Sequence, residues 1–89
     1  MTTGDSWPDA QARILIEQAS IDAIDEEIIS LIIRRDSHCK AVERARISEV
    51  RSRTDVAREN LIIHRYHSRI GSIGTVLAVS LIRSCRGYT

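Results

Sequence analysis

Apolar residues recur at three- and four-residue steps along the first half of the chain. Between residues 21 and 47 the row begins with Ile21, Ile24, Ile28, Leu31 and Ile32. This spacing is typical of one face of an α-helix. The pattern runs without Gly or Pro from Asp9 to Ile47, so we expect a helix of about 35 to 40 residues, roughly 50 to 60 Å long. Such a helix in so short a chain generally needs a second chain to cover its far end, which predicts an intertwined homodimer.

Two arginines interrupt this apolar row. Arg35 and Arg46 are eleven residues apart, which at roughly 100° per residue points both side chains in the same direction. A guanidinium group cannot lose its proton to escape burial, so two of them on a core-facing row need anionic partners. Those partners must come from the rest of the chain or from a ligand.

A second helix is expected after a polar turn at residues 48–53. Ser52 followed by Asp55 resembles a capping pair, which predicts a helix from there to Tyr66 or slightly beyond. On it Asp55, Glu59, Ile62 and Tyr66 would share one face, with Arg58 beside them. Polar groups therefore again occupy an otherwise apolar row.

A third, short helix is expected near the C-terminus. Gly71 and Gly74 predict a loop, after which Thr75 can cap a helix that stops near Gly87. At the other end, residues 1–8 are predicted as a flexible tail, with Pro8 in the first helical turn and Ser6 or Asp5 as its cap. The expected fold is all-α, a single domain over residues 1–89 with one long, one medium and one short helix.

The composition supports this class and excludes others. The sequence has one Pro, four Gly and 3% aromatic residues. It therefore has few of the turn-forming and aromatic residues that are typical of a β-fold. A formal net charge of +1 argues against a nucleic-acid partner. No apolar run approaches the length of a membrane span, and the start MTTGDSWPDAQ lacks signal-peptide features. We therefore expect a cytoplasmic protein with no membrane partner.

The two cysteines are too few for a disulfide framework. Cys39 and Cys85 both lie in helical patterns, and the plain interpretation is two free thiols in a reducing compartment. Cys39 is expected in the core rather than as a nucleophile. His64 and His67 could share a metal, but without a third ligand two solvated histidines are the better interpretation.

The charged residues on these faces form a compact mixed set. The set consists of Arg35, Arg46, Asp55, Arg58, Glu59 and Arg86. Each one alone would be read as a solvated charge or as half of an ordinary ion pair. Together the arginines outnumber the carboxylates on converging faces, and a small dianion is the simplest ligand to balance them.

These residues also carry a resemblance. The segment IDAIDEEII from Ile21, then Arg34–Arg35, KAV at 40–42, Arg46 and Arg58–Glu59 resemble the all-helical chorismate mutase family, in particular its short actinobacterial members. The similarity covers residues 21–66 closely and the third helix more loosely. The resemblance implies that the protein catalyses the rearrangement of chorismate to prephenate in phenylalanine and tyrosine biosynthesis, with no cofactor or metal. It also implies a complex with the enzyme of the first shikimate step.

The resemblance also implies roles for individual residues. Arg35 and Arg58 would bind the substrate carboxylates, and Arg46 would donate to the ether oxygen. Glu59 and Asp55 would hold the ring hydroxyl. Arg86 would add a polar contact to the ether oxygen. Val42 and Ile62 would form apolar walls.

One position departs from the family pattern. Seventeen residues before Arg35 the family carries an arginine that reaches into the partner subunit's site, and here that position is Gln18. Glutamine can donate one hydrogen bond to a carboxylate but loses the charge-assisted bidentate pair, worth about 1.5 to 3 kcal/mol. Three alternatives therefore stay open: a weak chorismate mutase, a mutase or pyruvate lyase for 4-amino-4-deoxychorismate or isochorismate, and a catalytically inactive helical dimer that serves as a partner module.

Overall fold

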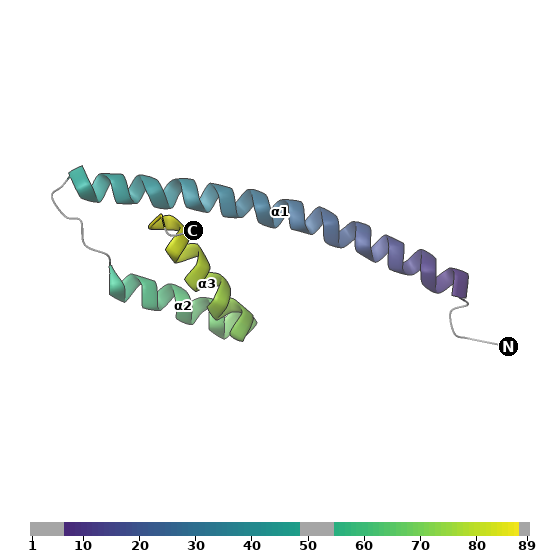
Figure 1. Ribbon diagram of the computed structural model, residues 1–89. Coiled ribbons are helices and arrows are strands. Elements are labelled where there is room, and N and C mark those ends of the chain that lie inside the picture. The colour runs from purple at the N-terminus through teal and green to yellow at the C-terminus, as the bar shows by residue number, and fades with distance from the viewer. Residues whose placement is uncertain (1–6, 49–54, 88–89) are drawn as a thin grey trace. The chain divides into compact units, whose positions relative to one another are not determined.

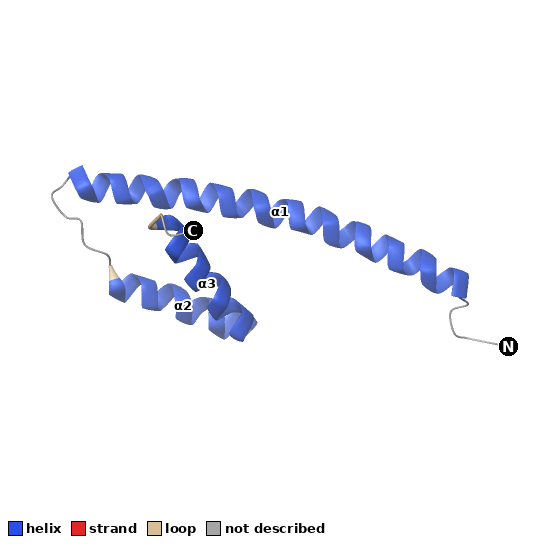
Figure 2. Cartoon of the chain, in the orientation of Figure 1, coloured by secondary structure: helices blue, strands red, loops and turns tan. Residues whose placement is uncertain are grey.

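Three α-helices make up the described part of the chain in this computed structural model, which places residues 7–48 and 55–87 (Figure 1). They are α1 (Trp7–Ser48), α2 (Val56–Ile70) and α3 (Ser72–Cys85). Within those ranges no residue lies in a strand (Figure 2). The predicted all-α class, with a long, a medium and a short helix in that order, is confirmed.

The chain divides into two compact units, Met1–Leu31 and Ile32–Thr89. The boundary falls inside α1, so the first unit is the N-terminal part of that helix. Its apolar row was expected to face a core, yet Ile21, Ile24 and Ile28 are each about half exposed. The difference arises because the buried residues of the described chain lie on α2 and α3 instead.

The long helix begins where a proline is tolerated. Pro8 lies in the first turn, where its missing N–H would have no intrahelical acceptor, and Asp9 complements the positive end of the helix dipole. Trp7 and Pro8 are helical, so the prediction of Pro8 in the first helical turn is confirmed, and the predicted tail does not include these two residues. The predicted caps Asp5 and Ser6 lie outside the described residues.

Asp55 starts α2, but not in the way the sequence suggested. It is the N-cap itself, and its Oδ1 accepts a hydrogen bond of 3.0 Å from the backbone N–H of Arg58. The predicted capping pair had placed Asp55 inside the helix, which was wrong by one turn, because an Asp with extended backbone can cap directly. Ser52, the other half of that pair, lies outside the described residues.

A single residue separates α2 from α3, so the predicted loop around residues 67–74 was wrong. Gly71 adopts φ 78°, which glycine reaches without strain, and the chain re-enters a helix at Ser72. Gly74 lies inside α3, where an added Cβ would meet Ile70 Cγ1 at 2.7 Å. Thr75, predicted as a cap, instead pairs its hydroxyl with His67 Nδ1 at 2.9 Å.

The close approach at Gly74 lets α2 and α3 build a small core. Ile62, Ala78 and Ile82 are buried together, with Ile63 and Tyr66 packed against them. The apolar faces of the two helices therefore cover each other. The helix α3 ends at Cys85 with Arg86 as its C-cap, and Gly87 follows with a φ of 91°, so the prediction that the helix stops near Gly87 is confirmed.

A disulfide joins α1 to α3 in the second unit. Cys39 and Cys85 are bonded, with their Cα atoms 5.8 Å apart and 46 residues between them in sequence. The expectation of two free thiols was wrong, because the fold of residues 32–89 brings both side chains to one place. None of the helices among residues 7–48, 56–70 and 72–85 is long and apolar enough to cross a membrane.

Candidate active site

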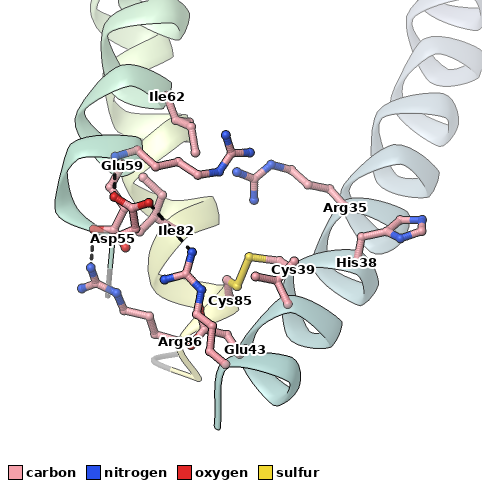
Figure 3. A pocket seen from close by; sticks show the side chains of 13 residues that line it. Arg35, His38, Cys39, Glu43, Asp55, Glu59, Ile62, Ile82, Cys85 and Arg86 are labelled. Carbon is pink, nitrogen blue, oxygen red and sulfur yellow. Dashed lines mark hydrogen bonds and ion pairs between the residues drawn. A yellow bond between two sulfur atoms is a disulfide. The ribbon is translucent and has the colours of Figure 1, made fainter. Parts of the chain in front are cut away.

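A cavity of about 350 Å³ lies among α1, α2 and α3 in the second unit (Figure 3). That volume is within the range of small-molecule sites. Its lining combines charged and apolar side chains and is formed by Arg35, His38, Cys39, Val42, Glu43, Arg46, Asp55, Arg58, Glu59, Ile62, Ile82, Cys85 and Arg86. All three helices contribute, so the cavity requires the folded unit and not one helix.

Four arginines line this cavity. Arg35 and Arg46 come from α1, Arg58 from the first turn of α2 and Arg86 from the residue that ends α3. Arg35 and Arg46 are half-buried, and Arg35 extends from α1 toward α2 (Figure 3). Because the spacing of eleven residues keeps Arg35 and Arg46 on one face of α1, the two cations reach the same cavity.

Three carboxylates balance part of this charge. Glu59 Oε1 pairs with Arg86 Nη2, which ties the end of α3 to α2 (Figure 3). Asp55 Oδ2 lies 4.0 Å from Arg46 Nη2 while its Oδ1 caps α2. Glu43 is the third. With four guanidinium groups against three carboxylates, the lining keeps an excess of positive charge.

Two of the four arginines, Arg35 and Arg58, differ from Arg46 and Arg86 in their contacts with carboxylates. Within the part of the chain that the structure describes, the guanidinium groups of Arg35 and Arg58 form no ion pair with a carboxylate. Both face the cavity. A planar guanidinium donates two parallel hydrogen bonds to a carboxylate, so this pair is suited to a ligand with carboxylate groups.

Asp36 lies on α1 next to this lining, and two side chains donate to its carboxylate. Lys40 Nζ binds its Oδ2 at 2.9 Å, and the Ser84 hydroxyl donates to its Oδ1 at 3.2 Å. The hydrogen bond from Lys40 is the main reason that the pKa of Asp36 is lowered from 3.8; reduced contact with solvent opposes the shift, and the charges of Lys40 and Arg35 and the Ser84 hydroxyl add to it. The contact with Ser84 links α1 to α3.

The lowered pKa of Asp36 predicts a pH-dependent loss of stability on substitution. The folded state holds the proton more weakly than the unfolded state, so the ionised carboxylate stabilises the fold above pH 3.8 and that contribution is lost as pH falls through the folded-state pKa. We expect Asp36→Asn to lower the free energy of unfolding at neutral pH, and the difference from wild type to shrink toward about pH 2.5. Urea unfolding at both pH values measures it. The exposed Asp22→Asn is the matched control, and an Asp36→Asn effect that does not change with pH would contradict the assignment.

Known proteins resemble this chain in sequence and in structure. No protein-family profile matches the chain. The intracellular chorismate mutase of Mycobacterium tuberculosis is 40% identical over 67 residues, which are 75% of this chain and 63% of that protein. The intracellular chorismate mutase of Mycolicibacterium smegmatis is 35% identical over 79 residues, 89% of this chain and 76% of that protein. The chain belongs to the chorismate mutase family.

A solved structure supports this membership. A chain of a non-covalent complex of DAHP synthase and chorismate mutase from Corynebacterium glutamicum, with a bound transition-state analogue, matches with a TM-score of 0.85 and 30% sequence identity. The match covers 90% of this chain and 96% of that one. The all-helical chorismate mutase fold is therefore present, although this chain spans only 63% of the length of the M. tuberculosis relative.

All but one of the residues predicted for the chorismate mutase site line the cavity. The residues found on the lining are Arg35, Val42, Arg46, Asp55, Arg58, Glu59, Ile62 and Arg86. Gln18 is exposed on α1 in the first unit, and its predicted role stays a prediction.

Some lining residues were not predicted for the site. His38 and Glu43 lie three and eight residues after Arg35, on the same side of α1, and helical spacing from Arg35 would have identified them. Ile82 packs in the α2–α3 core and also lines the cavity. Among the described residues, no group of three or more His, Cys, Asp or Glu is placed to hold a metal ion.

Proposed function

We propose that this chain catalyses the rearrangement of chorismate to prephenate. The observation that carries the proposal is the convergence of four arginines and Glu59 on one small cavity in a member of the chorismate mutase family. The reaction is a unimolecular Claisen shift that needs neither nucleophile nor proton transfer. A site must fold the dicarboxylate into a compact chair and stabilise the negative charge that develops on the ether oxygen.

The cations divide this work between them. Arg35 and Arg58 bind the two carboxylates, which fits their lack of an ion pair among the described residues. Arg46 donates to the ether oxygen, where charge develops in the transition state. Arg46 is half-buried and 4.0 Å from Asp55, so it is oriented by a carboxylate that does not fully neutralise it.

The remaining residues orient the ring. Glu59 accepts a hydrogen bond from the ring hydroxyl, assisted by Asp55, whose side chain already caps α2. Arg86, paired with Glu59, adds a polar contact to the ether oxygen. Val42 and Ile62 form apolar walls that hold the chair form in place. No step calls for a metal or cofactor.

The decay of chorismate, followed by absorbance, tests this function. The purified chain should accelerate the decay above the buffer rate, and chromatography should identify prephenate as the product. Free pyruvate, or turnover of the 4-amino analogue in preference to chorismate, would instead support an altered substrate, the alternative suggested by glutamine at position 18. A chain that does not exceed buffer with any of these substrates, alone or with an added partner protein, would refute the enzyme function.

A second role as a partner module is favoured by one observation. The structural relative was solved in complex with DAHP synthase, and that enzyme belongs to the first shikimate step. We propose that this chain forms a similar complex with the DAHP synthase of its own cell. Co-elution of the two purified proteins on size exclusion tests it, and chorismate decay with and without the synthase shows whether binding changes activity.

We further propose that the chain is a homodimer. The apolar row of the first unit is exposed, with Ile21, Ile24 and Leu31 each more than half accessible, and a second copy of α1 offers the matching face. The dimer would also bring the partner's Gln18 to the site. Light scattering is expected to give twice the chain mass, and a monomer at micromolar concentration would contradict the proposal.

A further inference from the structure

The disulfide between Cys39 and Cys85 lies on the lining of the candidate active site (Figure 3). Cys85 is 7% exposed and Cys39 is half-buried. Cys85 is followed directly by Arg86, which ends α3 and pairs with Glu59 across the cavity. The cross-link is therefore one residue away from a cation of the site.

In the part of the chain that the structure describes, a hydrogen bond also joins the end of α3 to α1. The Ser84 hydroxyl binds Asp36 Oδ1 at 3.2 Å, one turn of α1 before Cys39. Arg86 itself is anchored to its own helix, because its backbone N–H bonds Ile82 O at 3.2 Å and Arg83 O at 3.1 Å. The buried cluster of Ile62, Ala78 and Ile82 joins α3 to α2 and not to α1. The covalent bond is thus the strongest fixed point between the α1 wall of the cavity and the last turn of α3.

We propose that the Cys39–Cys85 disulfide is a redox-sensitive positioning cross-link that holds Arg86 at the cavity. The inference rests on the proposed function for its activity readout. Fixing the last turn of α3 removes freedom that Arg86 would otherwise lose on binding the substrate, so the oxidised chain is the better catalyst. Reduction breaks the covalent link between α1 and the last turn of α3, so the position of Arg86 is no longer fixed by it.

The redox step is a thiol–disulfide exchange with a dithiol. A thiolate of the dithiol attacks Sγ of Cys39, the more exposed of the two residues, the S–S bond breaks, and Cys85 leaves as a thiolate that takes up a proton. The second thiol of the dithiol then attacks its own sulfur in the mixed disulfide and releases Cys39 as a thiol. Two electrons and two protons pass to the cysteines, and the dithiol leaves as its cyclic disulfide. An oxidised disulfide reagent such as oxidised glutathione reverses the reaction.

The main experiment compares the two redox states of the intact wild-type chain. Protein treated with oxidised glutathione or with dithiothreitol is freed of reagent, and thiol titration and mass verify its state. We expect kcat/KM for chorismate to be about three- to tenfold lower in the reduced chain, the size of one hydrogen bond's net contribution. Equal kcat/KM values in verified states would overturn the proposal, as would a chain whose cysteines do not oxidise.

Two variants show whether the effect acts through Arg86. Cys39→Ser/Cys85→Ser should match the reduced wild type and respond to neither reagent. In Arg86→Ala the difference between oxidised and reduced protein should disappear, because the cross-link then positions nothing at the cavity. A redox effect of the same size in Arg86→Ala would assign the disulfide a purely structural role and overturn the proposal.

A readout without chorismate separates this proposal from the proposed function. Trypsin cleaves after Arg86, and mass spectrometry follows the loss of the residues beyond it. Cleavage should be several-fold slower in the oxidised chain, because the cross-link restrains the segment that must open. If neither redox state turns over chorismate, the enzyme function fails while slower cleavage still supports the cross-link. Equal cleavage rates in the two states would overturn the cross-link whatever the activity.

Discussion

Replacing Arg46 with Ala is expected to lower kcat/KM for chorismate by about 10²- to 10³-fold. Arg46 lines the cavity and is half-buried, and in the proposed mechanism it is the main donor to the ether oxygen, with Arg86 as a further polar contact. Removing one preorganised donor from developing negative charge costs about 2.7 to 4 kcal/mol in comparable sites. Most of the loss should appear in kcat, because the interaction strengthens in the transition state.

Arg44→Ala is the matched control for this variant. Arg44 is two residues away on α1, is exposed and points away from the face that carries Arg46, so the substitution removes the same charge without touching the cavity. Its kcat/KM should stay within about twofold of wild type. Thermal unfolding by circular dichroism checks that both variants fold. Equal losses in the two variants would mean that general charge, and not a donor at the ether oxygen, supports the reaction.

Replacing Gln18 with Arg is expected to raise kcat/KM for chorismate by about ten- to a hundredfold. Gln18 occupies the position where the resemblance to the family places an arginine that reaches the partner subunit's site. An arginine there restores a charge-assisted, bidentate hydrogen bond to a carboxylate, worth about 1.5 to 3 kcal/mol. The gain should depend on dimer formation and so should fall on dilution below the dimer dissociation constant.

Gln11→Arg provides the control for the added charge. Gln11 is exposed on the same helix, seven residues earlier, so the variant raises the net charge equally at another point of α1. We expect its steady-state kinetics with chorismate to match wild type. If Gln18→Arg also leaves kcat/KM unchanged or lowers it, the site is built around glutamine, and the 4-amino analogue and isochorismate become the substrates to test next.

The fold class and the helices were predictable because their causes are local. Uninterrupted three- and four-residue periodicity fixes α1, and glycines set the end of α2 and the end of α3. The arginine pair on α1 could be placed for the same reason, since helix geometry alone aligns Arg35 with Arg46. The predictions at Asp55 and around Gly74 were wrong although their causes are also local, because each residue type is compatible with two different roles. Asp55 serves as the cap, and Gly74 serves the approach of two helices and not a loop.

The sequence by itself determined three helices and a row of cations, because periodicity and breakers act within a few residues of each other. The tertiary structure alone decided which distant side chains meet. It paired Cys39 with Cys85 across 46 residues, joined Arg86 to Glu59 and left the apolar row of α1 exposed. Such contacts depend on how α2 and α3 pack and on which residues their core buries. A local sequence pattern does not determine which residues far apart in the chain lie close together in space.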